Sequence, residues 1–450
     1  MSTDIRIKKG LDIKLIGEAD KITTELPIGS VYAIKPEDFH GIIPKLIAKE
    51  KAQVKAGEAL FYSKADERIL FSSPVSGEVT EIMRGAKRKI LEIKIKADGA
   101  QNYHDFGIKN VNEMSDDAIK EHLLAAGCWP FIKQRPYDVI ANPNDTPKAI
   151  FISGYASAPL AGDLDYTLKG KEAELQAGIT ALTKLTTGKV HVSVNPHDIL
   201  SPFSNLRGIE LHNVSGPHPA GNVGTQINKI DPVNKGEVVW VIAPQDLVII
   251  GELLLTGKFN AKRTIALTGS EFETPKYITA LPGAEIKALV SDNLKENNTR
   301  IISGNVLSGK KVSLEGSLSY YDTQITAIPE GDDYELFGWN KPVFNKVSPT
   351  RALTFSWLSP NKKYNLNTNT NGEHRAFVMT GMYEKVFPLD IYPLQILKAC
   401  LYEDLDEMEA LGMYEVAPED FALTEFVCVS KQPHQKIIRE GLDLMIKEIG

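Results

Sequence analysis

The sequence predicts a multidomain protein of mixed α/β and α+β class. Its 450 residues are enough for three or four domains of usual size. Along the chain, short alternating apolar runs give way to helical periods, then to short runs again, and finally to helices. These changes place domain boundaries near residues 100, 255 and 330.

Residues 1–100 are predicted to form an N-terminal strand followed by a β-domain. Glycine and proline separate short apolar runs, as in residues 54–60 and 73–82. The spacing V-x-x-G-x-x-L, a turn, and then S-P-x-x-G-x-V-x-x-I resembles the barrel-sandwich hybrid of biotinyl and lipoyl carrier domains, whose glycines permit tight corners. The resemblance implies the same fold here.

Carrier domains hold their modified lysine at a hairpin tip, midway between the two glycines of this pattern. The midpoint between Gly57 and Gly77 falls at residues 67–68, which leaves Lys64 on the ascending strand. We therefore expect Lys64 to be a solvated strand residue. The carrier alternative predicts a covalent mass increment on Lys64.

Residues 101–255 are predicted to form a Rossmann-like α/β domain. A helix is expected around residues 115–124 and another over 170–185, with strands at 149–152 and 190–194. The order strand, helix, strand indicates a partly parallel sheet.

Two further domains are predicted beyond residue 255. Residues 256–330 are expected to form a small α+β domain of the β-grasp, SLBB-like type, and residues 331–450 a mainly helical domain. The predicted elements are β-rich runs at 263–269 and 300–309, a short helix near 283–292, and helices at 393–401 and 435–446.

Composition excludes several classes of protein. The balance of 51 Lys and Arg against 58 Asp and Glu gives a net charge of −7, so no general attraction to nucleic acid is expected. Three widely separated cysteines favour a reducing, cytoplasmic compartment. The N-terminus carries no signal-peptide pattern, and the most apolar window, 238–255, is interrupted by Pro244, Asp246 and Glu252. We expect no export and no membrane span.

Motifs for resident cofactors are missing. A flavin or dinucleotide site would need a glycine-rich loop before a helix. The corresponding place, residues 125–133, keeps Gly127 and fills the loop with Cys128, Trp129, Pro130 and Phe131. Cys128 has no neighbouring His or Asn signature and is expected to be a buried packing residue.

The segment 211–225 is the densest in glycine, proline and histidine. His212 and His218 are six residues apart, and no cysteine or carboxylate is locally placed to complete a metal site. We expect a glycine-rich connection with a structural or docking histidine, and no bound metal. The basic cluster Arg84, Lys87, Arg88 and Lys89 is read either as a solvated hairpin turn or as a contact for an acidic partner or anionic headgroups.

Several longer strings occur together and in a fixed order. They are residues 216–221 (GPHPAG), 300–309 (RIISGNVLSG), 374–378 (HRAFV) and 383–391 (YEKVFPLDI), with further short matches at 84–85, 231–233, 245–246 and 426–428. With them, the sequence resembles the NqrA subunits of the sodium-translocating NADH:quinone oxidoreductase from about residue 5 to the C-terminus.

The resemblance implies a subunit of a translocase, peripheral on the cytoplasmic side of the bacterial inner membrane. It implies docking on the membrane-embedded NqrB within a complex of NqrA to NqrF, and membrane contact through partners only. It also implies an association with quinone and no independent catalysis. FAD, FMN, riboflavin and iron–sulfur centres would lie in other subunits, and this chain would bind none.

The related Rnf-complex and complex I flavoprotein subunits carry FMN and NADH on the same α/β domain. An FMN- and NADH-binding subunit of an Rnf-like complex is therefore the alternative. This chain departs from those relatives at the flavin loop and lacks their CxxCxxC cluster motif. It departs from its own family at Gln226 and Asn228, where histidines are typical. The candidate quinone or partner contacts are Phe39, His40, Arg84, Lys87, Arg88 and His218.

Overall fold

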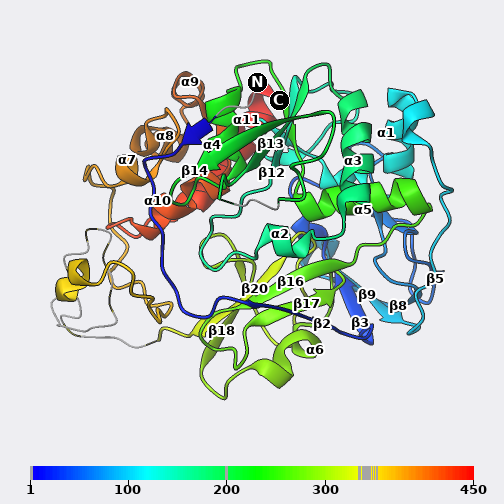
Figure 1. Cartoon of the computed structure of the whole chain (residues 1–450), viewed down its shortest axis with the longest axis horizontal. Helices are drawn as coiled ribbons and strands as arrows, with labels where there is room; N and C mark the ends of the chain where they lie inside the picture. Colours follow the sequence, from blue (N-terminus) through cyan, green and yellow to red (C-terminus); the bar gives the residue numbers. More distant parts are fainter. Residues whose placement is uncertain are drawn as a thin grey trace.

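The computed structural model describes residues 4–197, 201–332, 336, 346, 348, 350 and 353–450. Within these residues the chain forms four β-sheets and a C-terminal group of helices (Figure 1). The architecture confirms the predicted fold class: a barrel-sandwich hybrid, a Rossmann-like α/β sheet, a smaller α+β unit and C-terminal helices.

The barrel-sandwich part packs two small antiparallel sheets face to face, with strand orders β3-β9-β8-β5 and β4-β6-β7. Apolar residues alternate along these short strands and fill the space between the sheets; Leu60, Phe61 and Ile93 are fully buried. The strands are β3 (Val31–Ile34), β4 (Pro44–Leu46), β5 (Gln53–Val54), β6 (Ala59–Ser63), β7 (Leu70–Ser72), β8 (Gly77–Arg84) and β9 (Ile90–Ala97).

The hairpin between β6 and β7 bears on the carrier alternative. Its turn lies at residues 67–68, as predicted, and Lys64 is exposed one residue beyond the end of β6. The backbone N–H of Lys64 donates to the carbonyl of Ile43 at 2.9 Å. Lys64 therefore lies beside the hairpin stem and away from its tip.

The Rossmann-like sheet has the strand order β1-β14-β13-β12-β15-β10-β11. Strands β1, β14, β13, β12 and β15 are parallel to their neighbours, and β10 and β11 extend the sheet antiparallel. The strands are β1 (Asp4–Arg6), β10 (Lys133–Arg135), β11 (Val139–Ile140), β12 (Ala149–Ser153), β13 (Lys189–Val194), β14 (Ile209–Ser215) and β15 (Val239–Val241).

Helices cover both faces of this sheet. Val190, Val192 and Val194 point to the face on which α3 (Glu172–Lys184) and α5 (Pro244–Thr256) pack. Phe151 points to the other face and packs against Ile227 of α4 (Val223–Ile230). The remaining helices of this part are α1 (Asp116–Ala125), which Ser115 caps by accepting a hydrogen bond from the Ala118 N–H at 3.2 Å, and α2 (Leu164–Thr167).

The second large sheet has the order β19-β18-β20-β16-β17-β2. It contains β2 (Asp20–Glu25), β16 (Arg263–Thr268), β17 (Lys276–Ala280), β18 (Thr299–Ser303), β19 (Lys310–Val312) and β20 (Gln324–Pro329), with α6 (Ile286–Val290) against it. The predicted β-rich run 300–309 ends as a strand at Ser303, because Gly304 at φ 98° turns the chain. The N-terminal segment thus adds β1 to one sheet and β2 to another.

The C-terminal helices lie together beside the α/β sheet (Figure 1). They are α7 (Tyr383–Val386), α8 (Pro393–Leu401), α9 (Leu405–Ala410), α10 (Ala422–Phe426) and α11 (His434–Ile449). The predicted helices 393–401 and 435–446 correspond to α8 and α11. No described helix is both long enough and apolar enough to cross a bilayer.

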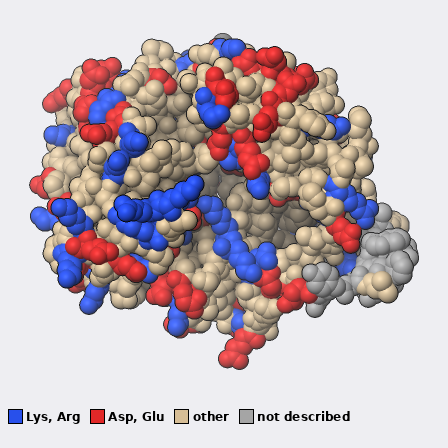
Figure 2. All heavy atoms as spheres, turned by 180° about the vertical axis from the view of Figure 1, so that it is seen from behind, with Lys and Arg blue, Asp and Glu red and all other residues tan. Residues whose placement is uncertain are grey.

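Positive and negative side chains are interspersed over the face that Figure 2 shows. Cys128 is fully buried, as predicted for a packing residue, and burial raises the pKa of its thiol. Cys400 and Cys428 are also buried and free.

Candidate functional site

A cleft lies at the point where the strand order of the α/β sheet reverses. From β12 the chain passes through α3 to β13 on one side, whereas β15 returns to the other side of β12 by way of α4. Loops diverge at the carboxyl ends of two such strands, which is where open α/β sheets bind ligands. The cleft has a volume of about 340 Å³.

The walls of the cleft come from three parts of the fold. The α/β sheet and its helices supply most of them, the loop before β20 supplies Tyr321, and the segment before α10 supplies Glu419. The other lining residues are Phe131, Lys133, Gln134, Arg135, Asp138, Ser153, Gly221, Asn222, Val223, Val241, Ile242, Ala243, Pro244 and Asp246.

One end of the cleft is aromatic and apolar. The Tyr321 hydroxyl donates to the carbonyl of Pro130 at 2.7 Å, and burial raises its pKa well above the ordinary value, so the ring is neutral. The ammonium of Lys133 lies 4.4 Å from the centre of the Tyr321 ring. Phe131 stacks against Tyr320 with ring centres 5.8 Å apart. This end is therefore lined by aromatic rings, with one cation beside them.

The charged groups of the cleft nearly balance. Lys133 and Arg135 are opposed by Asp138, Glu419 and Asp246. Asp246 forms a buried ion pair with Arg263 at 2.7 Å, and burial raises the pKa of the Asp246 carboxyl while Arg263 opposes that shift. The cleft therefore lacks the excess of positive charge that would favour a phosphate group.

The first turn of α4 packs closely against two charged side chains. A Cβ on Gly224, in the first turn of α4, would lie 2.4 Å from Oδ1 of Asp420 and 2.5 Å from Nη1 of Arg135. The carboxylate of Asp420 therefore lies against the first turn of α4, where a negative charge interacts favourably with the helix dipole.

Gly127, the one glycine left in the expected flavin loop, faces away from the cleft. At φ 69° its Cβ position lies 2.2 Å from Oγ of Ser72 in β7, so the glycine permits close packing of the barrel against the α/β part. Trp129, which follows it, is fully buried and donates from Nε1 to the carbonyl of Ala141 at 2.7 Å. The loop is part of the core.

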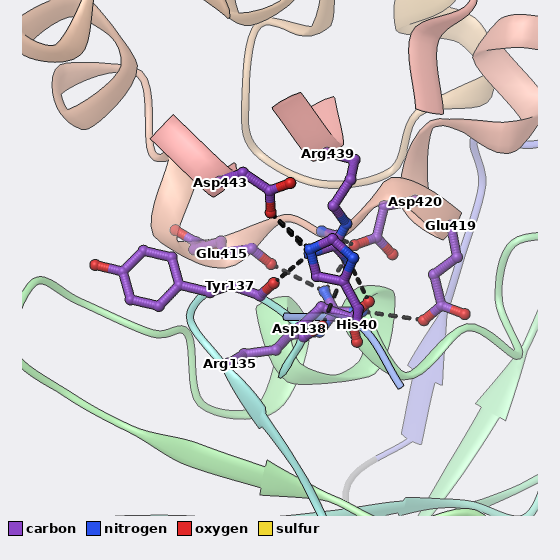
Figure 3. Close-up of polar contacts among 10 residues, drawn as sticks. His40, Arg135, Tyr137, Asp138, Glu415, Glu419, Asp420, Arg439 and Asp443 are labelled. Carbon is purple, nitrogen blue, oxygen red and sulfur yellow. Dashed lines mark hydrogen bonds and ion pairs between the residues drawn. The ribbon is translucent and has the colours of Figure 1, made fainter. Parts of the chain in front are cut away.

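A cluster of ion pairs borders the cleft and joins the α/β part to the C-terminal helices (Figure 3). Arg135 donates to Oδ2 of Asp420 at 2.7 Å and to Oε1 of Glu419 at 3.0 Å. Beside it, Arg439 of α11 donates to Oδ2 of Asp138 at 2.8 Å. These bonds fix the C-terminal helices against β10 and the turn that follows it.

Phe39 and His40 lie near this border. Phe39 is 2% exposed, and its ring centre lies 4.4 Å from that of Phe71 and 5.7 Å from that of Tyr321. Phe39 therefore supports a residue of the cleft wall from behind. His40 is half-buried, and its Nε2 lies 2.6 Å from Oδ1 of Asp443 on α11.

Arg84, Lys87 and Arg88 do not line the cleft. They share the exposed turn between β8 and β9, where the Arg84 guanidinium donates to the carbonyl of Arg88 at 3.4 Å. Lys87 and Arg88 have φ values of 54° and 62°. The three side chains form one exposed basic turn.

His218 is buried immediately behind the cleft. Its Nδ1 lies 3.1 Å from Oγ of Ser157, and that Oγ accepts the N–H of the lining residue Gly221 at 2.8 Å. Burial lowers the pKa of His218 to about 4, so its ring is neutral near pH 7. Gln226 is also buried and donates to Oγ of Ser153 at 2.8 Å. Asn228 donates to Glu415 at 2.7 Å.

A second group of histidines was not predicted from the sequence. His212 does not contact His218; its Nε2 lies 2.9 Å from Nδ1 of His191, and Glu210 lies beside them. The expectation that no carboxylate is placed near His212 was therefore wrong. The available signal was alternation: H-x-S in one strand and E-x-H in the next put polar side chains on one face of the sheet.

Three family models match the chain. They are the NqrA N-terminal barrel-sandwich hybrid domain at residues 5–98, the NqrA second alpha/beta domain at residues 114–259, and the NQRA C-terminal domain at residues 264–313.

Curated relatives match over almost the whole chain. The NqrA subunit of the Na(+)-translocating NADH-quinone reductase of Yersinia pestis bv. Antiqua (strain Angola) is 35% identical over 447 residues, covering 99% of this chain and 100% of the relative. The NqrA of Neisseria meningitidis (strain DSM 15465 / Z2491) is 35% identical over 450 residues, and that of Pasteurella multocida (strain Pm70) 32% over 449, with the same coverage. Among solved structures, an NAD+-reducing [NiFe]-hydrogenase in the air-oxidized state aligns with 51% of this chain and 52% of its own at 11% identity, with a TM-score of only 0.34.

Proposed function

The chain belongs to the NqrA family of the Na(+)-translocating NADH-quinone reductase, and from this premise we propose that its cleft receives the ring of a quinone. The enzyme that the relatives' name describes reduces quinone with NADH and moves sodium. In this proposal the present chain supplies a binding surface and no redox cofactor, and the electrons come from other subunits of the complex.

The composition of the cleft carries this proposal. A quinone ring is flat, neutral and apolar except at its carbonyl oxygens, which accept hydrogen bonds. Tyr321 and Phe131 line one end with aromatic carbon, and Lys133 offers an N–H donor at the same end. The near balance of charges suits a neutral ligand better than a phosphorylated one.

The FMN alternative is opposed by the same geometry. Flavin mononucleotide needs room and positive charge for its phosphate, whereas the carboxylate of Asp420 lies against Gly224 in the first turn of α4. In addition, the loop that would cradle the cofactor has Trp129 and Phe131 buried in the core. A flavin absorption band in the purified chain would nevertheless favour the alternative over the quinone proposal.

The quinone proposal is tested by filling the cleft. Ala243 is exposed, lines the cleft and occupies the N-cap position of α5. Ala243→Phe therefore adds a ring there without disturbing the core. Calorimetric titration of the purified chain with a short-tailed ubiquinone should show binding that Ala243→Phe weakens at least tenfold. Ala288→Phe, on the exposed side of α6, is the matched control and should bind like the wild type.

A second variant tests the hydrogen-bond donor. Lys133→Met keeps the length of the side chain but removes its N–H groups, and loss of a hydrogen bond from a charged donor costs about 1.5–3 kcal/mol. Weaker quinone binding by Lys133→Met and Ala243→Phe together supports the cleft as the site. Equal affinity in wild type and both variants would refute it.

We also propose that the chain is a peripheral subunit on the cytoplasmic side of the bacterial membrane and docks on the membrane-embedded NqrB. The basic turn of Arg84, Lys87 and Arg88 is offered as a contact for an acidic partner surface, since all three side chains are exposed. Replacing the three by serine should reduce recovery of the chain with the other subunits, most strongly at low salt, where the charges are least screened. Recovery equal to wild type at every salt concentration would exclude the turn from the interface.

A further inference from the structure

Three potential metal ligands lie together on one face of the α/β sheet, away from the cleft lining. His191 is in β13, and Glu210 and His212 are in β14. Parallel pairing sets His191 opposite Glu210, and alternation along β14 puts Glu210 and His212 on the same face. One ligand atom from each residue lies within 4.8 Å of those of the other two.

The donor set is that of a zinc site. Two imidazole nitrogens and one carboxylate oxygen are common protein ligands of Zn²⁺, and sites of this kind keep a fourth position for water. Zn–N bonds of about 2.0–2.1 Å in a tetrahedral site hold two nitrogens about 3.3 Å apart. Nδ1 of His191 and Nε2 of His212 are 2.9 Å apart, so small rotations of the rings would admit the ion.

The surroundings hold the histidines in place. The ring of His191 stacks on Phe151 of β12 with centres 4.9 Å apart, and both histidines are buried, with 8% and 2% exposure for His191 and His212. Glu210 is the more accessible ligand, with a side chain 24% exposed, and opens the group toward solvent. An ion can therefore enter from the Glu210 side without unfolding the sheet.

Simple packing explains this pair of imidazoles poorly. Valines occupy positions 190, 192 and 194 on the other face of β13, and they bury apolar surface without leaving polar atoms unsatisfied. Nδ1 of His191 and Nε2 of His212 face each other, and only one of these two nitrogens can donate to the other. A cation between the rings would use a lone pair from each.

We propose that His191, Glu210 and His212 bind one Zn²⁺ ion, with water as the fourth ligand. The ion would link β13 to β14 by side-chain bonds in addition to their backbone pairing. Lys189 forms an ion pair with Glu210 and is the group that the ion must displace from the carboxylate.

The test uses the full chain, purified without a polyhistidine tag and freed of metal with a chelator. Titration with ZnCl₂ against a chromophoric competitor should give one site per chain, and Co²⁺ in its place should give the visible absorption of a tetrahedral site. Because changes outside the ligand shell already cost about 10–100-fold in metal affinity, His191→Ala, His212→Ala and Glu210→Gln should each weaken Zn²⁺ at least tenfold.

Two further variants sharpen the result. Lys189→Met removes the ion pair with Glu210 and should tighten Zn²⁺ binding, whereas unchanged binding would remove Glu210 from the site. His104→Ala is the matched control, because His104 also lies near a carboxylate, 3.6 Å from Glu58, but outside the group. If either histidine variant folds poorly, Glu210→Gln at the accessible ligand still decides the matter. Equal Zn²⁺ affinity in wild type, Glu210→Gln and His212→Ala would overturn the proposal.

Discussion

Arg135 and Asp420 form a buried ion pair of 2.7 Å between residues 285 positions apart in the chain. Both side chains are at most 2% exposed. The pair joins the end of β10 to the segment before α10, and therefore fixes the C-terminal helices against the sheet that carries the cleft.

Removing one member of this pair should be strongly destabilising. Asp420→Ala leaves the guanidinium of Arg135 buried with Glu419 as its remaining acidic partner. Removing one partner of a buried ion pair leaves the other charge uncompensated, which costs about 3–5 kcal/mol of the free energy of unfolding. We expect the lower end of this range, because Glu419 still bonds to Arg135. Urea unfolding followed by circular dichroism measures the change.

An exposed ion pair gives the comparison for Asp420→Ala. Lys235 bonds to Glu409 at 2.9 Å, and the Lys235 side chain is 68% exposed. Lys235→Ala should change the free energy of unfolding by no more than about 1 kcal/mol. Equal effects of the two substitutions would contradict the role assigned to the buried pair.

Gly224→Ala should destabilise the chain although alanine favours helices. In the helix interior, alanine gains about 1 kcal/mol over glycine. The new Cβ, however, would lie 2.4 Å from Oδ1 of Asp420 and 2.5 Å from Nη1 of Arg135, and Nη1 is held in place by its bond to Oδ2 of the same carboxylate. Overpacking of this kind costs about 1–3 kcal/mol, so a net loss is expected in urea unfolding.

The cause of that loss can be checked by a double variant. In the Asp420→Ala background, Gly224→Ala should be less harmful, because one of the two colliding groups is gone. Gly29→Ala is the control for glycine replacement, since the nearest atom to its Cβ is Oη of Tyr32 at 3.7 Å. Additive effects of Gly224→Ala and Asp420→Ala would show that the clash is not with Asp420.

Individual helices and strands were predictable from the sequence, but the pairing of distant strands into sheets was not. Alternation and helical periods identified the helix that is α1 and the strands β12 and β13, because those patterns lie within a few residues. By contrast, β1 is three residues long and pairs with residues 213–215 of β14. No local pattern specifies such a distant partner.

The candidate site shows the same limit. The absence of a flavin loop was visible at residues 127–131, since it depends on residue types in one short segment. The packing of Asp420 against Gly224 was not visible, because those two residues meet only in the folded chain. His191 and His212 likewise come together only through the pairing of β13 with β14.

Glu330 should make the stability of the second sheet depend on acidic pH. It follows β20 and accepts from Arg300 of β18 at 3.1 Å and from Lys311 of β19 at 2.7 Å. These bonds lower the pKa of Glu330 to about 2 from an ordinary 4.5. The unfolded chain therefore binds the proton first, and the stabilising effect is lost as pH falls from about 4.5 to about 2.

The Glu330 prediction is checked by urea unfolding at several pH values. Glu330→Gln should be less stable than wild type near pH 6, and the difference should shrink toward pH 2. A difference that stays constant from pH 6 to pH 2 would show that the charge of Glu330 does not contribute.

His218 should make the free energy of unfolding fall over a higher pH range than Glu330 does. The direction of this pH dependence follows from the burial of the His218 ring. The pKa of its ring is lowered to about 4, against an ordinary 6.5, because the charged form is poorly solvated. Between these values the unfolded chain binds a proton that the folded chain refuses, so stability declines as pH falls from about 6.5 to about 4 and is constant with respect to this group above 6.5. His218→Gln keeps a hydrogen-bonding side chain near Ser157 without this titration, and its unfolding free energy should lose that part of the slope. Parallel pH curves for wild type and His218→Gln would mean that the buried ring is protonated as readily as in the unfolded chain, and the cleft would then have a positive charge directly behind Gly221 at mildly acidic pH.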